Sequence, residues 1–236
     1  MTVQLDSMIN EVYKMEIEKK ESELRALQAQ MNPHFLYNCL SGIKWKALRK
    51  GDDDISDITG LLAKFYRTAL NNGQQITTVS SELENIRAYI EIQKKMHEEP
   101  FEVEYRIDES GLECCMPNFL LQPLVENAII HGLSKKEEGG TVRVHIWQKD
   151  GFTFITIGDN GLGMDEAALM HLRGELEKED GKTGIGLGNI FRRIRAMYQD
   201  GNVEIYSKKD VGTVVKIQIR HKEVGEHDVP CVGGGR

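Results

Sequence analysis

The sequence predicts an α+β protein, in which an N-terminal helical coiled-coil region precedes an α/β sandwich domain. Two observations carry this prediction. Up to about residue 98, apolar residues recur at steps of three and four, as the buried face of a helix requires. After Pro100, short segments alternate or run apolar as strands do, with helical patterns between them. Strands interspersed with helices, and an antiparallel hairpin among them, favour a sheet with helices on one face.

The overall composition is that of a globular chain. The 236 residues carry a formal net charge of −7, with 40% hydrophobic and 28% charged residues. This acidic balance argues against a general nucleic-acid-binding surface. No apolar run approaches the ~20 residues of a membrane-spanning helix, and the polar N-terminus is unlike a signal peptide. The four cysteines show no metal-ligand or disulfide-framework spacing, so we expect reduced thiols in a cytosolic setting.

Residues 1–30 are predicted to form a coiled coil. Leu5, Met8, Val12 and Met15 keep heptad-like steps, and the apolar pattern resumes in a shifted phase further along. This spacing favours a helix that pairs with a partner helix. The alternative is a single solvated helix, because the apolar seam covers few heptads.

Three further helices are expected in the first half of the chain. The first spans residues 33–50. The second spans about 56–72 and follows the acidic turn KGDDD, whose aspartates suit a helix N-terminus. The third follows from SSELENIRAYIEIQKKM, where Ser81 and Glu84 have the spacing of a capping box.

Five strands and three helices are predicted in the second half. Lys149, Asp150 and Gly151 form a turn, so the strands on either side of them are expected to pair as a hairpin. The strands are predicted at 101–107, 142–147, 152–157, 203–206 and 213–219, and the helices at 118–132, around 165–178 and at 187–199. Residues 222–236 carry no periodic pattern and are expected to be a disordered tail.

Two glycine clusters in the second half indicate a nucleotide site. The first, IGDNGLGM at 157–164, places Asp159 at the end of a strand, where its carboxylate could accept a hydrogen bond from an adenine amino group. Gly161 and Gly163 would form the floor of that pocket. Each cluster alone is a turn as often as a site. Together, separated by a polar loop that could close over a ligand, they favour a nucleotide.

The second cluster, GKTGIGLGNIFRRI at 181–194, places Gly184, Gly186 and Gly188 at the entrance to a helix. Bare backbone N–H groups at a helix N-terminus suit an anion such as phosphate. The cluster is not a P-loop, because Leu176 stands where that motif needs glycine and no strand precedes it. It is not a dinucleotide-binding fingerprint either, because its glycines are spaced G-x-G-x-G.

The segment NFLLQPLVENAIIHGL at 118–133 combines an apolar helix with two polar residues, Glu126 and Asn127. Burying such groups is unfavourable unless they have partners. Asn127 could bind a magnesium ion that keeps most of its waters and bridges phosphates. Alternatively, Glu126 and Asn127 cap or brace neighbouring loops.

Taken in order, these motifs resemble those of a known family. The set of Asn127, Asp159-x-Gly161-x-Gly163 and Gly184-x-Gly186-x-Gly188 resembles the N, G1 and G2 boxes of the gyrase and histidine-kinase type ATP-binding fold. The segments LQAQMNPHFLYNCLSGI, EIQKKM and LLQPLVENAIIHGL resemble LytS/YehU-type sensor histidine kinases. The resemblance covers roughly residues 24–220.

The resemblance implies a domain organisation and a set of partners. Residues 1–30 would be a signalling coiled coil, 31–98 the helical dimerisation and phospho-acceptor region, and 99–221 the ATP-binding catalytic domain, ahead of the 222–236 tail. The chain would form a homodimer through its N-terminal helices and pass phosphate to an aspartate of a response-regulator receiver domain. No nucleic-acid partner is expected. The chain would be the cytoplasmic portion of a membrane-anchored bacterial protein, with a sensor segment upstream of Met1.

The resemblance also assigns a nucleotide site whose ligands are ATP and Mg²⁺. Asn127 would hold the magnesium ion, and Asp159, with Gly161 and Gly163, would bind adenine. The loop between the two glycine clusters would be the ATP lid. Ile130 stands where a basic residue is common in the family, so phosphate neutralisation would fall to His131, Lys182 or Arg192. The remaining residues of the assigned set are Thr183, Gly184, Gly186 and Gly188.

His34 would be the phospho-acceptor, attacking the γ-phosphate through a neutral imidazole nitrogen, and an ordinary histidine is mostly neutral at cytoplasmic pH. Pro33 cannot donate to the carbonyl of Ala29, so a helix kinks or restarts there and could expose His34. Without the ATP-site motifs, His34 would read as a capping or partly buried histidine. Asn38 shares the helical face of His34 and could orient a water for dephosphorylating a partner aspartate, or could bond locally.

Two other functions stay open at this point. Hydrolysing members of the superfold carry a glutamate base four residues before the magnesium asparagine, where this chain has Pro123. This difference speaks against a stand-alone ATPase of the same fold. The second alternative is a degenerate, ATP-gated dimerisation module, because Phe35 follows His34 in place of the acid that is usual after a phospho-acceptor.

Overall fold

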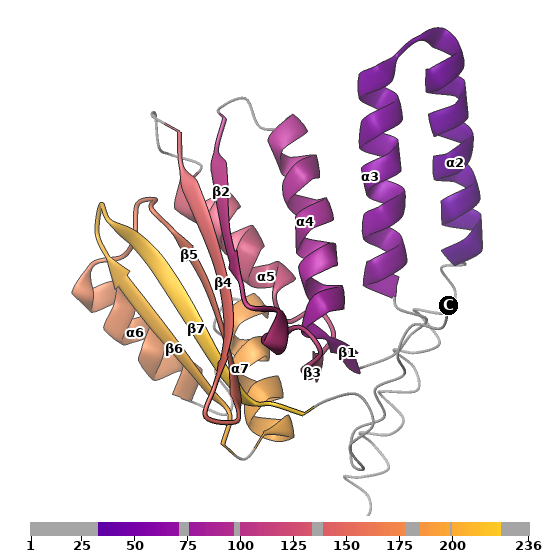
Figure 1. Cartoon of the computed structure of the whole chain (residues 1–236). Helices are drawn as coiled ribbons and strands as arrows, with labels where there is room; N and C mark the ends of the chain where they lie inside the picture. Colours follow the sequence, from indigo (N-terminus) through magenta and orange to yellow (C-terminus); the bar gives the residue numbers. More distant parts are fainter. Residues whose placement is uncertain are drawn as a thin grey trace, which may run out of the picture.

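The computed structural model describes residues 33–70, 76–96, 100–133, 139–177, 185–198 and 200–222. The predictions for residues 1–30, for Lys182, Thr183 and Gly184, and for residues 223–236 lie outside this part of the chain. Within it, a helical hairpin, a layer of helices and a sheet lie side by side (Figure 1). This arrangement confirms the predicted α+β class.

The hairpin consists of α2 (Pro33–Lys50) and α3 (Asp53–Leu70). Gly51, at a positive φ of 72°, reverses the chain between them. Asp52 then caps α3, since its Oδ1 accepts a hydrogen bond from the backbone N–H of Ile55 at 3.1 Å. Both predicted helices are confirmed, and α3 begins three residues earlier than predicted because of this cap.

The third predicted helix is α4 (Val79–Met96), and it begins before the predicted capping box of Ser81 and Glu84. The prediction of that box is wrong, because Thr78 occupies the cap and its Oγ1 accepts a hydrogen bond from the N–H of Ser81 at 3.2 Å. Thr78 ends the short strand β1 (Ile76–Thr78), which pairs with a strand from the second half of the chain. A strand of three residues leaves too little pattern in the sequence to be predicted.

The five predicted strands are all present and form one sheet. They are β2 (Glu102–Ile107), β4 (Thr141–Lys149), β5 (Phe152–Asp159), β6 (Asn202–Lys208) and β7 (Gly212–Arg220). The strand order is β2-β4-β5-β7-β6, with β2 parallel to β4 and every other pair antiparallel. Asp150 and Gly151, both at positive φ, form the turn of the predicted β4–β5 hairpin, which is confirmed.

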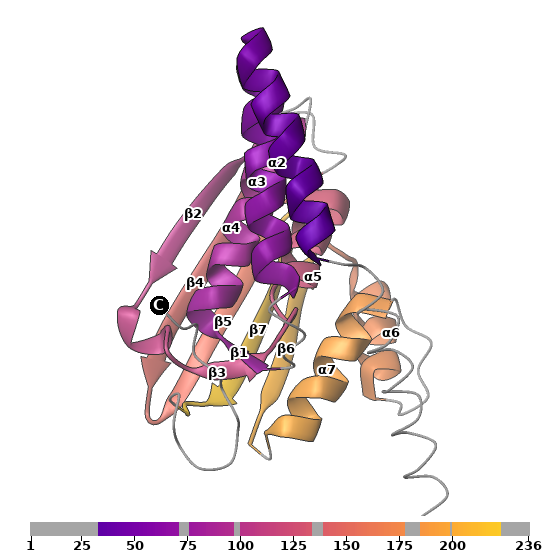
Figure 2. The same cartoon turned by 90° about the vertical axis from the view of Figure 1, so that its right-hand side faces the viewer.

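One face of the sheet is covered by α4 and by the helices of the second half (Figures 1 and 2). These helices are α5 (Gln122–Glu126), the π-helical turn η3 (Asn127–Leu133), α6 (Glu166–Glu177) and α7 (Ile185–Met197). The 3₁₀ turn η2 (Glu109–Gly111) and the strand β3 (Cys115–Pro117), which pairs with β1, complete the fold. Helices and strands share one apolar core, whose fully buried members include Ile86, Ile129, Ile146, Ile194 and Ile217.

The helix predicted at 118–132 begins later than predicted, and its second half is not a regular α-helix. Residues 118–121 form a turn in which Phe119 has a positive φ of 57°, and α5 begins only after this turn, with Pro123 near its start. At Asn127 the α-helix continues as the π-helical turn η3, a feature that is frequent at functional sites. The apolar pattern could not predict the turn, because residues distant in the sequence hold it.

Among the described cysteines, Cys39 is an exposed free thiol and Cys114 is a buried one. The backbone N–H of Cys115 donates to the carbonyl oxygen of Lys222 at 2.9 Å, so the first residue of the predicted disordered tail has an ordered partner.

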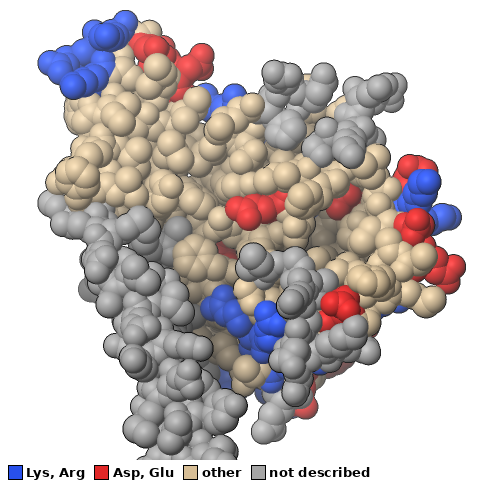
Figure 3. Space-filling view, turned by 180° about the vertical axis from the view of Figure 1, so that it is seen from behind, with Lys and Arg blue, Asp and Glu red and all other residues tan. Residues whose placement is uncertain are grey.

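Charge on the surface is mixed in sign. On the face seen from behind (Figure 3), lysines and arginines gather in separate clusters, with acidic side chains between them. At the tip of the hairpin, Arg49 and Lys50 end α2, and Asp53 and Asp54 begin α3. No helix among the described residues is long and apolar enough to cross a membrane.

Candidate active site

A cavity of about 230 Å³ lies between the helical layer and the sheet. Asn127 and His131 border it from η3, Asp159 from the end of β5, and Gly163 from the loop that follows. A mostly apolar pocket with a few polar groups is typical of small-molecule sites. Its apolar walls include Leu124, Ile157, Met164, Leu172, Leu187 and Val215.

The Asp159 carboxylate is held firmly at one side of the cavity. Asp159 is 8% exposed, and its Oδ1 accepts a hydrogen bond from the backbone N–H of Gly161 at 2.8 Å. Gly132, on η3, packs directly against it, because a Cβ at Gly132 would lie 2.6 Å from Asp159 Cγ. A glycine is therefore needed at position 132 to leave room for the carboxylate.

Close packing also requires glycine at the two positions after Asp159 that were predicted to take part in binding. A Cβ on Gly161 would overlap the carbonyl group of Gly132. Gly163 has a positive φ of 59°, and a Cβ there would overlap the backbone of Lys208. Both glycines let the loop after β5 run close to η3 and β6.

Asn127 begins η3 and faces the start of α7. A Cβ at Gly186 would lie 4.0 Å from Asn127 Nδ2 and 3.5 Å from Pro123 Cβ. Gly186 and Gly188 both lie in the first turn of α7. The fold thus brings the predicted magnesium ligand next to the N-terminal backbone N–H groups of a helix, where anions are stabilised.

The three residues considered for phosphate neutralisation occupy different positions relative to the cavity. His131 lines the cavity and is exposed to solvent. Arg192 donates from Nη2 to Asn189 Oδ1 at 2.7 Å, within its own helix. Lys182 lies, with Thr183 and Gly184, outside the described residues.

Among the cavity-lining residues that were not in the predicted set, Thr213 and Gly132 lie beside Asp159. Thr213 on β7 lies directly opposite Asp159 in the β5–β7 register, and Gly132 packs on the Asp159 carboxyl group. Predicting that β5 pairs with β7 would have placed Thr213 opposite Asp159. No motif pointed to Gly132, because its role depends on the approach of η3 to the strand end.

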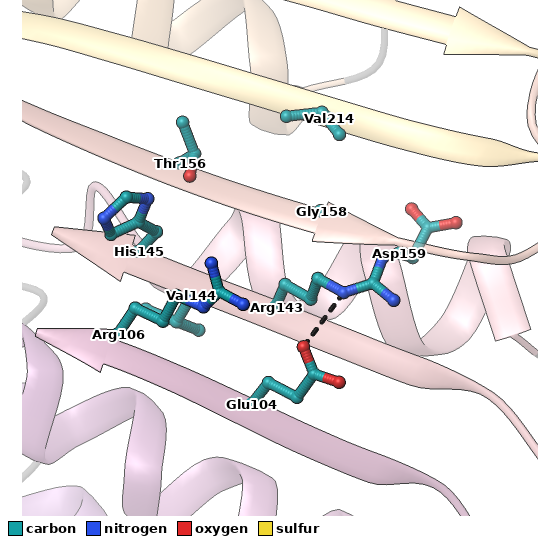
Figure 4. Close-up of a pocket in the computed structure, with 9 residues that line it drawn as sticks. All are labelled: Glu104, Arg106, Arg143, Val144, His145, Thr156, Gly158, Asp159 and Val214. Atoms are coloured by element: carbon teal, nitrogen blue, oxygen red, sulfur yellow. Dashed lines mark hydrogen bonds and ion pairs between the residues drawn. The ribbon is translucent and has the colours of Figure 1, made fainter.

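A larger cavity, of about 310 Å³, lies on the opposite, open face of the sheet (Figure 4). Its lining comes entirely from strands and includes Arg106, Arg143 and His145. Arg143 Nε is 3.0 Å from Glu104 Oε2. The side chain of Arg143 is 57% exposed and that of Glu104 is 50% exposed. This cavity brings together neither Asn127 nor the glycines of α7, so the smaller cavity is the candidate site.

His34 and Asn38 lie on a different part of the fold. The backbone of His34 is in the first turn of α2, and Asn38 follows one turn later with an exposed side chain. The cavity-lining residues all come from the part of the chain after Leu121. Figure 1 shows α3 and α4 between α2 and α5.

Comparison with known proteins matches each half of the chain to a family that includes histidine kinases. The family described as Histidine kinase matches residues 22–101, and the family described as Histidine kinase-, DNA gyrase B-, and HSP90-like ATPase matches residues 118–223. The chain therefore has a region of the histidine kinase family followed by a domain of the ATPase family shared with gyrase B and HSP90.

Two relatives in sequence are named as sensor proteins. Sensor histidine kinase YesM of Bacillus subtilis is 36% identical over 216 residues, covering 89% of this chain and 36% of that protein. Sensor protein LytS of Bacillus cereus is 31% identical over 212 residues, with the same coverage of 89% and 36%. A solved histidine kinase domain from Erythrobacter litoralis EL346 has a TM-score of 0.44 and 15% identity, covering 79% of this chain and 95% of that chain.

The chain belongs to the sensor histidine kinases of two-component systems, and within them it is of the LytS and YesM type. It spans 36% of the length of these two relatives.

Proposed function

We propose that this chain uses Mg-ATP to phosphorylate its own His34 and then transfers the phosphoryl group to an aspartate of a response regulator. The observation that carries the proposal is the cavity in which Asn127, Asp159 and the first turn of α7 converge. In this proposal residues 31–98 present His34 and residues 99–221 bind ATP. The chain acts on the cytoplasmic side of a bacterial membrane.

The Asp159 side of the cavity suits adenine. A carboxylate only accepts hydrogen bonds, so it pairs with an amino group, such as that of adenine, and not with a carbonyl oxygen. The flat faces of the base would lie against the apolar walls, where Ile157 and Leu187 contribute. Gly161 and Gly163 allow the loop after β5 to approach the base closely.

The Asn127 side suits the phosphates. The amide oxygen of Asn127 is an acceptable ligand for Mg²⁺, a cation that prefers oxygen. A bound Mg²⁺ would supply neutralisation of the phosphate charge at this side of the cavity. The backbone N–H groups near Gly186 and Gly188, together with His131, would bind the phosphates themselves. Lys182, Thr183 and Gly184 complete the proposed set.

His34 is the proposed acceptor. A ring nitrogen of His34 would attack the γ-phosphorus, and the bond from that phosphorus to the β,γ-bridging oxygen would break as ADP leaves. Catalysis of this step rests on positioning and charge neutralisation. Asn38, exposed one turn along α2, is proposed to orient water when the regulator's phosphoaspartate is hydrolysed.

Exposed apolar residues on the hairpin support a homodimer. Phe35 and Trp45 are 68% and 67% exposed, and Ile43, Leu48 and Ile55 are 48%, 44% and 48% exposed. Apolar surface of this kind marks an interaction site. Two hairpins packed as a four-helix bundle would bury part of this surface. The proposed dimer therefore forms through α2 and α3.

The test is incubation with γ-labelled ATP and Mg²⁺, comparing the native chain with His34→Gln and Asn127→Ala. We expect an acid-labile, alkali-stable label on the native chain and its loss in both variants. His145→Gln and Asn202→Ala, both on strands of the sheet, serve as matched controls and are expected to keep the label.

Other outcomes select the alternatives. Steady phosphate release without labelled protein would favour a stand-alone ATPase of the same fold. Nucleotide binding without phosphohistidine would favour an ATP-gated dimerisation module. A label that survives His34→Gln would exclude His34 as the acceptor.

A further inference from the structure

Three hydrogen bonds connect the hairpin to the helix that leads into Asn127. Thr68, near the end of α3, donates from Oγ1 to Asn85 Oδ1 at 3.0 Å. Asn85, on α4, donates from Nδ2 to Gln122 Oε1 at 3.3 Å. Gln122, the first residue of α5, donates from Nε2 to Glu126 Oε1 at 3.1 Å. The series of bonds ends one residue before Asn127.

Asn85 is the centre of this series. It is 2% exposed, and both ends of its amide are used, the oxygen toward α3 and the nitrogen toward α5. A buried amide that loses a partner is left with an unsatisfied polar group, which is unfavourable. The position of α3 therefore bears on the orientation of Asn85 and, through it, of Gln122.

The Thr68 hydroxyl has acceptors within its own helix as well as on α4, and the carbonyl oxygen of Lys64 lies 3.2 Å from its Oγ1. The Thr68 hydroxyl has one hydrogen, and its Oγ1 also lies 2.9 Å from the carbonyl oxygen of Phe65 in the same helix. It can donate to Asn85 or to Phe65, but not to both at once. If the hairpin moves away, Thr68 keeps a partner while Asn85 loses one. The loss of this hydrogen bond therefore affects Asn85 on α4 and, through it, Gln122 on α5.

The surrounding contact joins α3 to α4, so it has to open if His34 is to meet a nucleotide bound by its own chain. α3 lies between α2 and α4 in both views (Figures 1 and 2). The rings of Phe65 and Tyr89 have centroids 6.0 Å apart, and Lys95 Nζ is 3.2 Å from Asp57 Oδ2. Partly polar interfaces of this kind are typical of parts that move relative to each other.

We propose that Asn85 is a positioning residue that couples the hairpin to nucleotide binding. With Thr68 bonded to it, Asn85 holds Gln122 and Glu126, and so fixes α5 at the point where η3 begins and Asn127 borders the cavity. This inference rests on the proposed function, in which Asn127 holds Mg²⁺. Because coupling between two equilibria is reciprocal, bound Mg-nucleotide also favours the docked hairpin.

The test is the affinity of the full chain for adenylyl imidodiphosphate, a non-hydrolysable ATP analogue, measured by calorimetry with and without Mg²⁺. Thr68→Val keeps the shape of the side chain and removes the hydroxyl. We expect it to lower affinity in Mg²⁺ about fivefold, a usual size for coupling between sites, and to leave affinity without Mg²⁺ unchanged. Thr68→Ser keeps the hydroxyl and is expected to retain the native affinity.

Thr59→Val is the matched control, because Thr59 Oγ1 donates to the carbonyl oxygen of Ile55 at 2.6 Å within α3. An affinity of Thr68→Val equal to that of Thr59→Val would overturn the coupling. A loss in Thr68→Ser without one in Thr68→Val would also overturn it, because packing of the methyl group would then be the cause. A native chain that binds no nucleotide overturns the proposed function as well, whereas native binding with an unaffected Thr68→Val overturns the coupling alone.

Discussion

The carboxylate of Glu82 accepts a hydrogen bond from the backbone N–H of Leu121, at 2.9 Å from its Oε2. The N–H groups of Leu120 and Phe119 donate to the same carboxylate at 2.9 and 2.8 Å. Glu82 is 1% exposed, and burial raises its pKa, although these three donors and the charge of Arg193 oppose the rise. One buried acid on α4 thus holds the turn that precedes α5.

Glu82→Gln is expected to lower the free energy of unfolding by about 1–3 kcal/mol, the usual cost of leaving buried polar groups unpaired. The glutamine amino group would face backbone N–H groups in place of an acceptor. Urea unfolding followed by circular dichroism measures the change. Glu84→Gln, at an exposed position on the same helix, is the control and is expected to stay within about 0.5 kcal/mol of the native value. Equal stability of the two variants would contradict the role of Glu82.

Gly132→Ala is expected to abolish or strongly weaken nucleotide binding while the fold persists. The added Cβ would lie 2.6 Å from Asp159 Cγ, so the carboxylate must move from its position at the cavity. Binding of adenosine by calorimetry, with circular dichroism as the check on folding, measures this effect. The control is Gly174→Ala on α6, where a Cβ meets nothing within 4 Å. Unchanged adenosine affinity in Gly132→Ala would show that the carboxylate position is unimportant.

Tyr89→Phe is expected to flatten the loss of stability at alkaline pH. Burial, and then the charge of Glu126, raises the pKa of Tyr89 from 10.0 to about 12. The folded pKa lies above the unfolded one, so the contribution to stability is fully present below about pH 10 and is lost as pH rises toward 12. Melting temperatures across this range measure it. Tyr206→Phe, at an exposed position, is expected to follow the native curve, and identical curves for all three chains would contradict the prediction.

Trp45→Glu is expected to weaken the proposed dimer at least tenfold, because it places a charge on an apolar contact surface and removes a large aromatic side chain. Trp45 is 67% exposed on α2. Sedimentation equilibrium gives the dissociation constant. Tyr206→Glu, at a position that is 50% exposed on β6, is the control for added charge. A dimer that tolerates Trp45→Glu as well as it tolerates Tyr206→Glu would move the interface away from this face of the hairpin.

Local patterns predicted most of the elements. The alternation of apolar residues gave all five strands of the sheet, and the Asp150–Gly151 turn gave the hairpin between two of them. Glycine spacing and the placement of Asp159 and Asn127 pointed to one nucleotide site, and the structure brings both residues to one cavity. These features are visible in the sequence because each depends on neighbours within one element.

Features that depend on distant partners escaped prediction. Glu82 reads as one more acid of a helix, yet its partners lie 37 to 39 residues away. Asn85 reads as an ordinary polar residue, yet it joins α3 to α5. The turn at 118–121 and the cap at Thr78 were missed for the same reason.

The sequence by itself determined the class of protein and the strands of the sheet, and it supplied the residues proposed for the nucleotide site. The tertiary structure decided where α5 begins, which glycine makes room for Asp159, and which buried polar groups tie the hairpin to the site. Periodicity records only whether a residue faces the core or the solvent. A hydrogen bond to a buried partner is fixed by the packing of whole elements, so it leaves no regular mark on the order of the residues.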